Sequence, residues 1–232
     1  TEGVILSLNG GKKWKRITRG YRSLYNVESL AFDPFDAQTL YVGTWRRGWK
    51  TVDGGKKWKA IHKGMLFDSD MFSLVVNPLN PKIIYSSACT GIYKSENKGS
   101  NWIRLKKGLP KKARRTRTLH LDPSDPKKIY AGTTVGLFMS TNSGQNWRQL
   151  LSDVVVNTIV VHPGNTEIVL AGTDDAGVLR SNDGGLTFKS SNSGFIHRQI
   201  PSIAIDAHRV GTYYATASTD SQFGGFFISK DH

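Results

Sequence analysis

Apolar residues along the chain fall in short runs separated by turns rich in glycine, asparagine, aspartate and proline. No stretch keeps an apolar spacing of about 3.6 residues over the length of a helix. Short apolar runs bounded by turn-forming residues are typical of strands in antiparallel sheets. The pattern therefore predicts an all-β chain with almost no helix.

An eight-residue segment recurs along this pattern. It starts with Ser or Thr, has Asn or Asp at its third position, contains glycine, and ends on an aromatic residue. Complete copies occupy residues 7–14, 51–58, 95–102, 140–147 and 181–188, and another begins at 229. Successive copies start 44, 44, 45, 41 and 48 residues apart. A fixed period of this length indicates a repeat architecture.

A second series of turns runs in step with the first. Asp33-Pro34, Asn77-Pro78, Asp122-Pro123 and His162-Pro163 each separate two apolar runs. Each repeat therefore predicts four short antiparallel strands, the pattern of a β-propeller blade. We expect residues 1–232 to form a single domain of about five blades, with both ends of the chain inside a blade. Six segments match the third strand of the repeat, so we expect part of a ring of six to eight blades.

The recurring segment resembles the Asp-box, or BNR repeat, whose pattern is Ser/Thr-x-Asp-x-Gly-x-x-Trp. The chain is thus similar to Asp-box β-propellers, which include xyloglucanase-like enzymes, sialidases, sortilin-type receptors and photosystem II assembly factors. The resemblance implies that the boxes hold the fold and lie away from the ligand face. We expect each Asn or Asp to accept hydrogen bonds from amides two or three residues on, and each aromatic ring to pack. The structural positions are Asn9, Trp14, Asp53, Trp58, Asn97, Trp102, Asn142, Trp147, Asp183 and Phe188.

Charge is distributed unevenly. Lys and Arg outnumber Asp and Glu by 24 to 8 in residues 1–117, a net +16, while residues 118–232 have 8 against 10, a net −2. These sum to the +14 of the whole chain. An asymmetric excess of this kind favours an acidic partner.

We expect the basic excess to lie on loops at the ligand face. Arginine favours carboxylate and phosphate groups, and Trp45 offers an apolar centre among the cations. The predicted partner-binding residues are Arg19, Arg22, Trp45, Arg46, Arg47, Lys106, Lys107, Lys111, Lys112, Arg114, Arg115 and Arg117.

An enzymatic alternative rests on the resemblance to xyloglucanase-like glycosidases, which use two carboxylates. Asp174, Asp175 and Asp220 are the candidates, although adjacent side chains such as Asp174 and Asp175 point different ways. The Phe/Tyr-Arg-Ile-Pro motif of sialidases is absent. The six histidines are scattered and there is one cysteine, so we expect no metal site and no cofactor.

The sequence favours a non-catalytic, protein-binding propeller that docks an acidic surface of a larger complex as a scaffold, accessory subunit or assembly factor. A glycan is the alternative ligand, and nucleic acid is the least favoured partner. No apolar run is long enough to span a bilayer. The resemblance implies an extracytoplasmic location, whether periplasmic, lumenal or secreted.

Overall fold

A computed structural model describes residues 3–65, 70–111, 113, 115–194, 196, 199–206, 208–209, 211–218 and 224–230. These residues form antiparallel sheets, and their one helical element is the short 3-10 turn η1 (Arg22–Leu24). The chain divides into two compact units, residues 1–105 and residues 106–232. The expected all-β architecture of four-stranded blades is confirmed, and each unit is described in turn.

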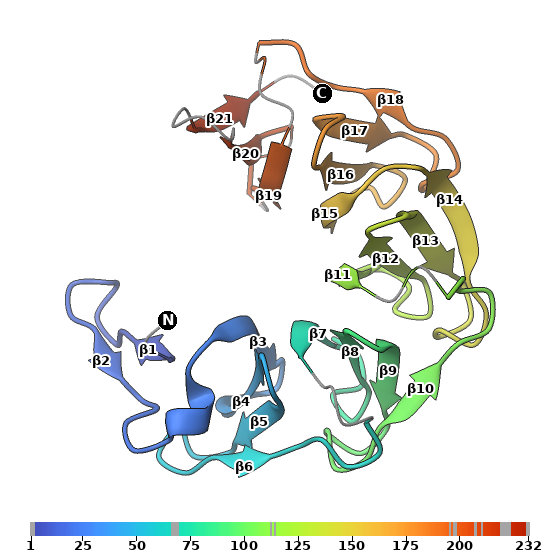
Figure 1. Ribbon diagram of the computed structural model, residues 1–232. Coiled ribbons are helices and arrows are strands. Elements are labelled where there is room, and N and C mark those ends of the chain that lie inside the picture. The colour runs from blue at the N-terminus through green and yellow to red at the C-terminus, as the bar shows by residue number, and fades with distance from the viewer. Residues whose placement is uncertain are drawn as a thin grey trace. The chain divides into compact units, whose positions relative to one another are not determined.

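Unit 1 contains three sheets, each formed from consecutive strands (Figure 1). A two-stranded sheet comes first, followed by two sheets of four strands. The first sheet pairs β1 (Ile5–Leu6) with β2 (Lys15–Arg16). The second runs in the order β3 (Val27–Asp33), β4 (Asp36–Thr44), β5 (Gly48–Thr51) and β6 (Lys59–Ala60). The third comprises β7 (Met71–Val76), β8 (Ile84–Ala88), β9 (Gly91–Ser95) and β10 (Ile103–Leu105).

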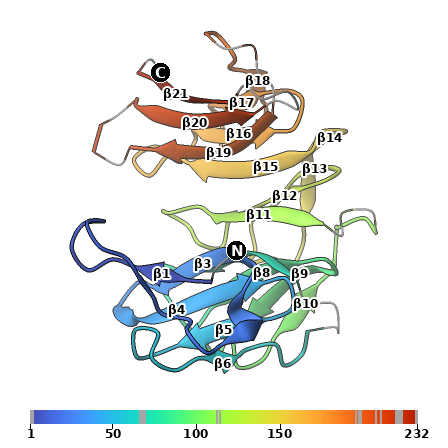
Figure 2. The ribbon, with the colours of Figure 1, turned by 60° about the vertical axis from the view of Figure 1, so that its left-hand side comes forward.

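Unit 2 also contains three sheets, two of four strands and one of three (Figure 2). The first comprises β11 (Thr116–Leu121), β12 (Ile129–Thr133), β13 (Gly136–Ser140) and β14 (Arg148–Ser152). The second comprises β15 (Val156–Val161), β16 (Val169–Thr173), β17 (Val178–Ser181) and β18 (Lys189–Ser190). The third comprises β19 (Gln199–Ile205), β20 (Tyr213–Ser218) and β21 (Gly225–Ser229).

The second strand of three of the four-stranded sheets is buried along its whole length. Every residue of β8, β12 and β16 is buried, because these strands lie inside their sheets and both faces are covered. Small residues are needed where the backbone of one strand lies close to the side chains of neighbouring strands. A Cβ on Gly132 would lie 2.7 Å from the Thr118 side chain and 2.8 Å from that of Val156. Glycine before the final threonine of β12 is therefore a packing requirement.

The apolar core of each unit lies between successive sheets. In unit 1, Tyr41 of β4 clusters with Met71 of β7 and with Trp102, which ends the third box. In unit 2, Tyr130 of β12 clusters with Val156 and Ile159 of β15. Sheets that bury a face against the next repeat are what the repeated pattern predicts.

Candidate functional site

The two ends of each sheet differ in what they carry. In unit 1, Thr51 at the end of β5 pairs with Leu40, while Gly48 at its start pairs with Gly43. The Asp-box that follows Thr51 and the turn that precedes Gly48 are therefore at opposite ends of the strands. We call these the box end and the loop end. The same register holds in unit 2, where Ser140 pairs with Ile129 and Gly136 with Thr133.

Each Asp-box closes on its own side chains. In the fourth copy, the Ser140 hydroxyl donates to Asn142 Oδ1 (3.0 Å) and accepts the Gly144 amide (2.9 Å), and Asn142 Oδ1 accepts the Asn146 amide (2.9 Å). The other four copies repeat this pattern. The expectation of bonds to amides two or three residues on was wrong for most copies: the acceptor reaches four residues on, because two left-handed residues widen the turn. Asp183 also bonds an amide three residues on, that of Leu186.

The aromatic residue of three boxes is buried, as expected, and in two of these its ring N–H is bonded. The Trp102 indole donates to the Ile61 carbonyl (2.9 Å), and the Trp58 indole donates to those of Ile17 and Gly55 (3.1 Å each). Trp147 is buried and Phe188 is partly buried. Trp14 departs from the expectation, because 57% of its surface is exposed.

A third in-phase series was missed in the sequence. Six residues after the aromatic residue of each box the backbone has a positive φ, at Gly20 (89°), Gly64 (90°), Gly108 (87°), Asp153 (58°) and Gly194 (91°). A Cβ at Gly64 or Gly108 would lie within 2.3 Å of the carbonyl oxygen of the following box tryptophan. Four glycines at the same place in the repeat were the available signal. The crossover between sheets therefore has a left-handed residue at the same position in each repeat.

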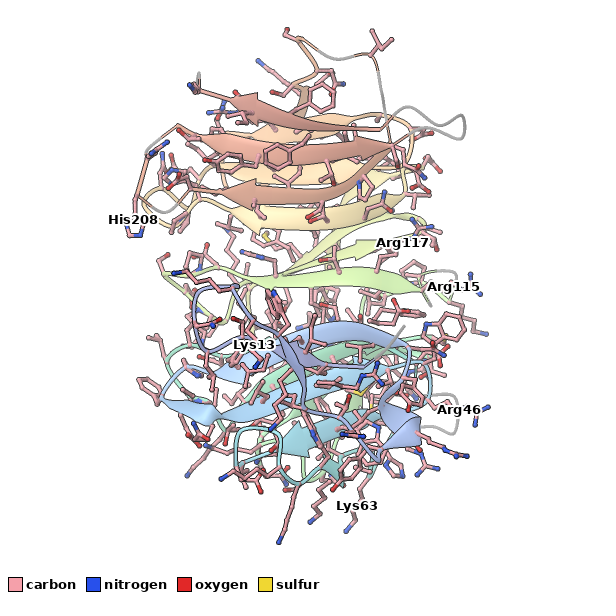
Figure 3. The ribbon with its side chains drawn as sticks, turned by 90° about the vertical axis from the view of Figure 1, so that its left-hand side faces the viewer. Lys13, Arg46, Lys63, Arg115, Arg117 and His208 are labelled. Atoms are coloured by element: carbon pink, nitrogen blue, oxygen red, sulfur yellow. The ribbon has the colours of Figure 1, made fainter. Side chains whose placement is uncertain are left out.

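The loop end of unit 1 brings together part of the predicted basic group. The Trp45 amide donates to the Asn26 carbonyl (3.3 Å), which ties the β4–β5 turn to the crossover after η1. The Trp45 indole donates to the Glu28 carboxylate, yet 56% of its surface stays exposed. Arg22, Arg46 and Arg47 are exposed on these two segments, and Figure 3 shows Arg46 extending away from the sheet. We call Arg22, Trp45, Arg46 and Arg47 the arginine cluster.

Arg19 is exposed on the crossover before η1, close in sequence to Ile17, whose carbonyl accepts the Trp58 indole. Because Trp58 directly precedes β6 at the box end, this part of the crossover starts at the end opposite the arginine cluster.

The basic crossover of unit 2 also runs from one end of its sheet to the other. The Lys107 carbonyl accepts the Trp147 amide (3.0 Å) at the box end, whereas the Arg115 carbonyl accepts the Thr134 amide (3.3 Å) at the loop end. Figure 3 shows Arg115 and Arg117 on one side of unit 2 and His208 on the other. Lys106 and Lys111 are exposed. Lys112 and Arg114 lie outside the described residues.

Asp174, a candidate of the enzymatic alternative, belongs to a polar network at the loop end of unit 2. Its carboxylate accepts the Asn157 amide (2.8 Å) and pairs with Arg117 Nη1 at 3.3 Å from each oxygen. The Gln199 amide lies 3.5 Å away. Partial burial raises the pKa of Asp174, but the Asn157 bond, the Arg117 charge and the Gln199 bond outweigh it and hold the pKa below its usual value. Asp174 is thus an ion-paired carboxylate, poorly suited to act as a general acid.

The other two candidate carboxylates do not complete an acid and base pair in the described structure. Asp175 is exposed beside Asp174, and Asp220 lies outside the described residues. The Arg117 guanidinium pairs with Asp174 and donates to the side-chain Oδ1 of Asn157, and its role in partner binding stays a prediction.

In the part of the chain that the structure describes, no group of three or more His, Cys, Asp or Glu side chains could hold a metal ion. Nor does that part of the chain contain a helix long and apolar enough to cross a membrane.

No family model and no curated protein matches the sequence. Solved structures do match the fold. An ancestral enzyme of glycoside hydrolase family 74 has a TM-score of 0.80 at 17% identity, over 98% of this chain and 33% of its own. The family 74 xyloglucanase from Xanthomonas campestris has a TM-score of 0.70 at 17% identity, over 88% of this chain and 36% of its own.

A structure with a different role also matches. The extracellular domain of a protein described as a hybrid two-component system from B. thetaiotaomicron has a TM-score of 0.67 at 17% identity, over 88% of this chain and 26% of its own. The chain therefore has the fold of an Asp-box β-propeller and spans about a third of the length of the structures it matches. Within that class it has five complete boxes and a basic loop end in unit 1.

Proposed function

We propose that this chain is a non-catalytic, protein-binding propeller that docks an acidic protein surface, as a scaffold, accessory subunit or assembly factor of an extracytoplasmic complex. The observation that carries the proposal is the arginine cluster at the loop end of unit 1. There an exposed tryptophan lies on the same turn as Arg46 and Arg47, and a backbone bond ties this turn to the segment after Arg22.

The chemistry of the arginine cluster suits such a partner. Guanidinium groups form paired hydrogen bonds with carboxylates, and tryptophan and arginine are the residues that most often dominate protein interfaces. Single exposed ion pairs contribute only about 0–1 kcal/mol, so affinity requires several cations acting together around the ring. Lys106, Lys107, Lys111 and Arg115 of unit 2 extend the basic character of the chain.

An experiment on association rates tests this proposal. A partner would be captured by cross-linking from the native source, and its association with purified chain would be measured across salt concentrations. We expect Arg46→Glu/Arg47→Glu to slow association about tenfold at low salt and to change dissociation less. The matched control is Lys12→Glu/Lys13→Glu, which makes the same charge change on exposed box residues.

The proposal fails if binding is insensitive to salt, because exposed charges are screened at about 8 Å in physiological salt. It also fails if both charge-reversed pairs slow association equally, because the effect would then come from net charge rather than from the arginine cluster.

The glycoside hydrolase alternative is supported by the likeness to family 74 enzymes, and it has its own test. The chain would be incubated with xyloglucan, and reducing ends would be measured for the native chain and for Asp174→Asn. Turnover that Asp174→Asn abolishes would replace the binding proposal. We expect no turnover, because Arg117 and Asn157 already occupy the Asp174 carboxylate.

A further inference from the structure

A groove along the last two strands of the second sheet of unit 1 is lined by several lysines. Its lining comes from β5, β6 and the Asp-box that joins them, and from the Asp-box of the next sheet. Its volume is about 500 Å³. Five lysines line it, Lys50, Lys57, Lys59, Lys63 and Lys98, together with one carboxylate, that of Asp53. The volume lies in the range of small-molecule sites, roughly 300–1,000 Å³.

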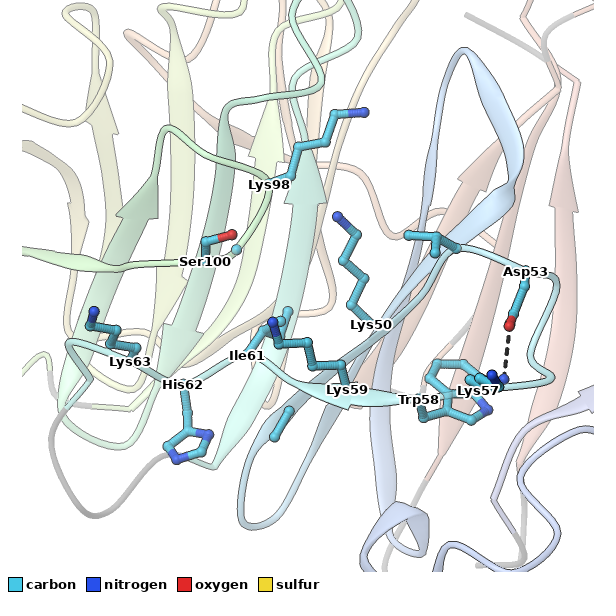
Figure 4. Close-up of a pocket in the computed structure, with 13 residues that line it drawn as sticks. Lys50, Asp53, Lys57, Trp58, Lys59, Ile61, His62, Lys63, Lys98 and Ser100 are labelled. Atoms are coloured by element: carbon cyan, nitrogen blue, oxygen red, sulfur yellow. Dashed lines mark hydrogen bonds between the residues drawn. The ribbon is translucent and has the colours of Figure 1, made fainter.

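The one carboxylate in the lining does not neutralise these lysines. Asp53 Oδ1 accepts the Thr51 hydroxyl (2.7 Å) and the Lys57 amide (2.9 Å), so it belongs to its own turn. Figure 4 shows this bond to Lys57 on the side away from Lys50 and Lys98.

The two innermost lysines are held in place by the fold. Lys98 Nζ bonds the buried Asp33 carboxylate at 2.7 Å, across from one sheet to the next. Lys50 is half-buried, with its Nζ 5.4 Å from the centre of the Tyr41 ring. Burial lowers the pKa of Lys50, and the nearby charge of Lys98 lowers it further. Lys50 and Lys98 thus lie near each other, with the carboxylates of Asp33 and Asp36 nearby. Lys57, Lys59 and Lys63 are exposed along the same groove.

We propose that this groove is a binding site for a small ligand carrying two or more phosphate groups. A cleft lined by charges of one sign concentrates counter-ions, and lysine binds phosphate as a point charge without a fixed geometry. A phosphate monoester carries about 1.5 to 2 negative charges at neutral pH, so two groups match the four lysines other than Lys98, which Asp33 already pairs, better than two sulfates do. No residue of the arginine cluster lines the groove, so the two are separate sites.

The probe is sodium tripolyphosphate, titrated into the chain by calorimetry at constant ionic strength. We expect one saturable site and binding at least tenfold tighter than that of orthophosphate. Lys59→Met/Lys63→Met removes two exposed charges without touching a bond of the fold, and should weaken binding at least tenfold. Lys12→Met/Lys13→Met, the matched control on the first box, should change affinity less than twofold.

A second variant reaches the interior of the groove. Lys50→Met should weaken tripolyphosphate binding as well, with its melting temperature recorded to show that it still folds. Arg46→Glu/Arg47→Glu should leave this affinity within twofold, so failure of the docking proposal and failure of this one are distinguishable.

Three results would overturn the site. The first is no saturable heat up to millimolar tripolyphosphate. The second is equal weakening by the groove pair and the control pair, which would mean diffuse surface charge. The third is tighter binding of a heparin-derived disaccharide of equal charge, which would overturn the assignment to phosphate.

Discussion

At the scale of single residues, the positive φ values at the crossovers limit which amino acids these positions can carry. The crossover positions with positive φ tolerate a side chain only where space exists for it. Gly108 faces the Trp147 carbonyl directly, whereas a Cβ on Gly194, at the same place in a later repeat, would meet nothing within 4 Å. Glycines at equivalent positions of the repeat therefore differ in how close their neighbours lie.

Gly108→Ala should be far more destabilising than Gly194→Ala. Both variants put a side chain on a left-handed backbone, at a cost of about 1–2 kcal/mol, but only Gly108→Ala also forces a contact, at 2.1 Å, with the Trp147 carbonyl oxygen. We expect a loss of about 3 kcal/mol or more for the first and about 1 kcal/mol for the second in chemical denaturation. Equal losses would show that the close contact relaxes without cost.

Asp153→Gly is the reciprocal experiment. Asp153 is the non-glycine member of the series, with a φ of 58°. Glycine adopts this conformation without steric cost, so we expect a gain of about 0.5–1 kcal/mol in the free energy of unfolding. A loss of stability would mean that the Asp153 side chain makes a contribution larger than the backbone strain.

His120 should make stability depend on pH. Its Nε2 accepts the Val161 amide from the next sheet (3.3 Å), and burial lowers its pKa to about 4, against a smaller opposing effect of Asp122. The unfolded chain takes up a proton near pH 6.5 and the folded chain does not, so stability is complete above that pH and falls as the pH drops toward 4. We expect a loss of at most about 2 kcal/mol between pH 7 and pH 5.

The measurement is a series of denaturation curves between pH 7 and pH 5. His120→Gln should flatten the pH dependence, while the exposed His208→Gln should leave it unchanged. Constant stability of the native chain over this range would contradict the inference that His120 stays uncharged in the folded state.

At the scale of elements, the Asp-box turn and the strands could be predicted from sequence because their signals are local and recur in phase. The two turn series predicted strands on either side of each box, and the four-stranded sheets lie around their boxes. Partners across sheets could not be predicted. The Asp174–Arg117 pair joins residues 57 positions apart, and the lysine groove joins two boxes, so both arise only when neighbouring sheets pack.

The hydrogen bonds of the box lead to a prediction for Asn142. Asn142→Ala removes the acceptor of the Asn146 amide and of the Ser140 hydroxyl, and should cost about 1 kcal/mol. Asn142→Asp should retain stability, because Asp53 and Asp183 occupy this place in other copies. The comparison is made by thermal melting. Equal losses for both variants would show that the side-chain oxygen is not what closes the turn.

At the scale of the whole molecule, the net charge of +14 lowers the stability of the folded state. Like charges repel across a compact surface, and salt screens them. The melting temperature should therefore rise between 10 mM and 300 mM sodium chloride. A fall would mean that ion pairs such as Lys98–Asp33 outweigh the repulsion.

The self-contained Asp-box has a consequence for how this molecule can change. In the fourth box the side-chain bonds that close the turn lie within eight residues and come from the first and third residues, so the side chains at the sixth and seventh positions are not needed for them. These two positions carry lysine in the second box and glutamine and asparagine in the fourth. The charge carried by each box can accordingly be changed by substitution at these two positions while the turn beneath stays the same. A lineage, or an engineer, could move a binding preference from one blade to another with two or three substitutions.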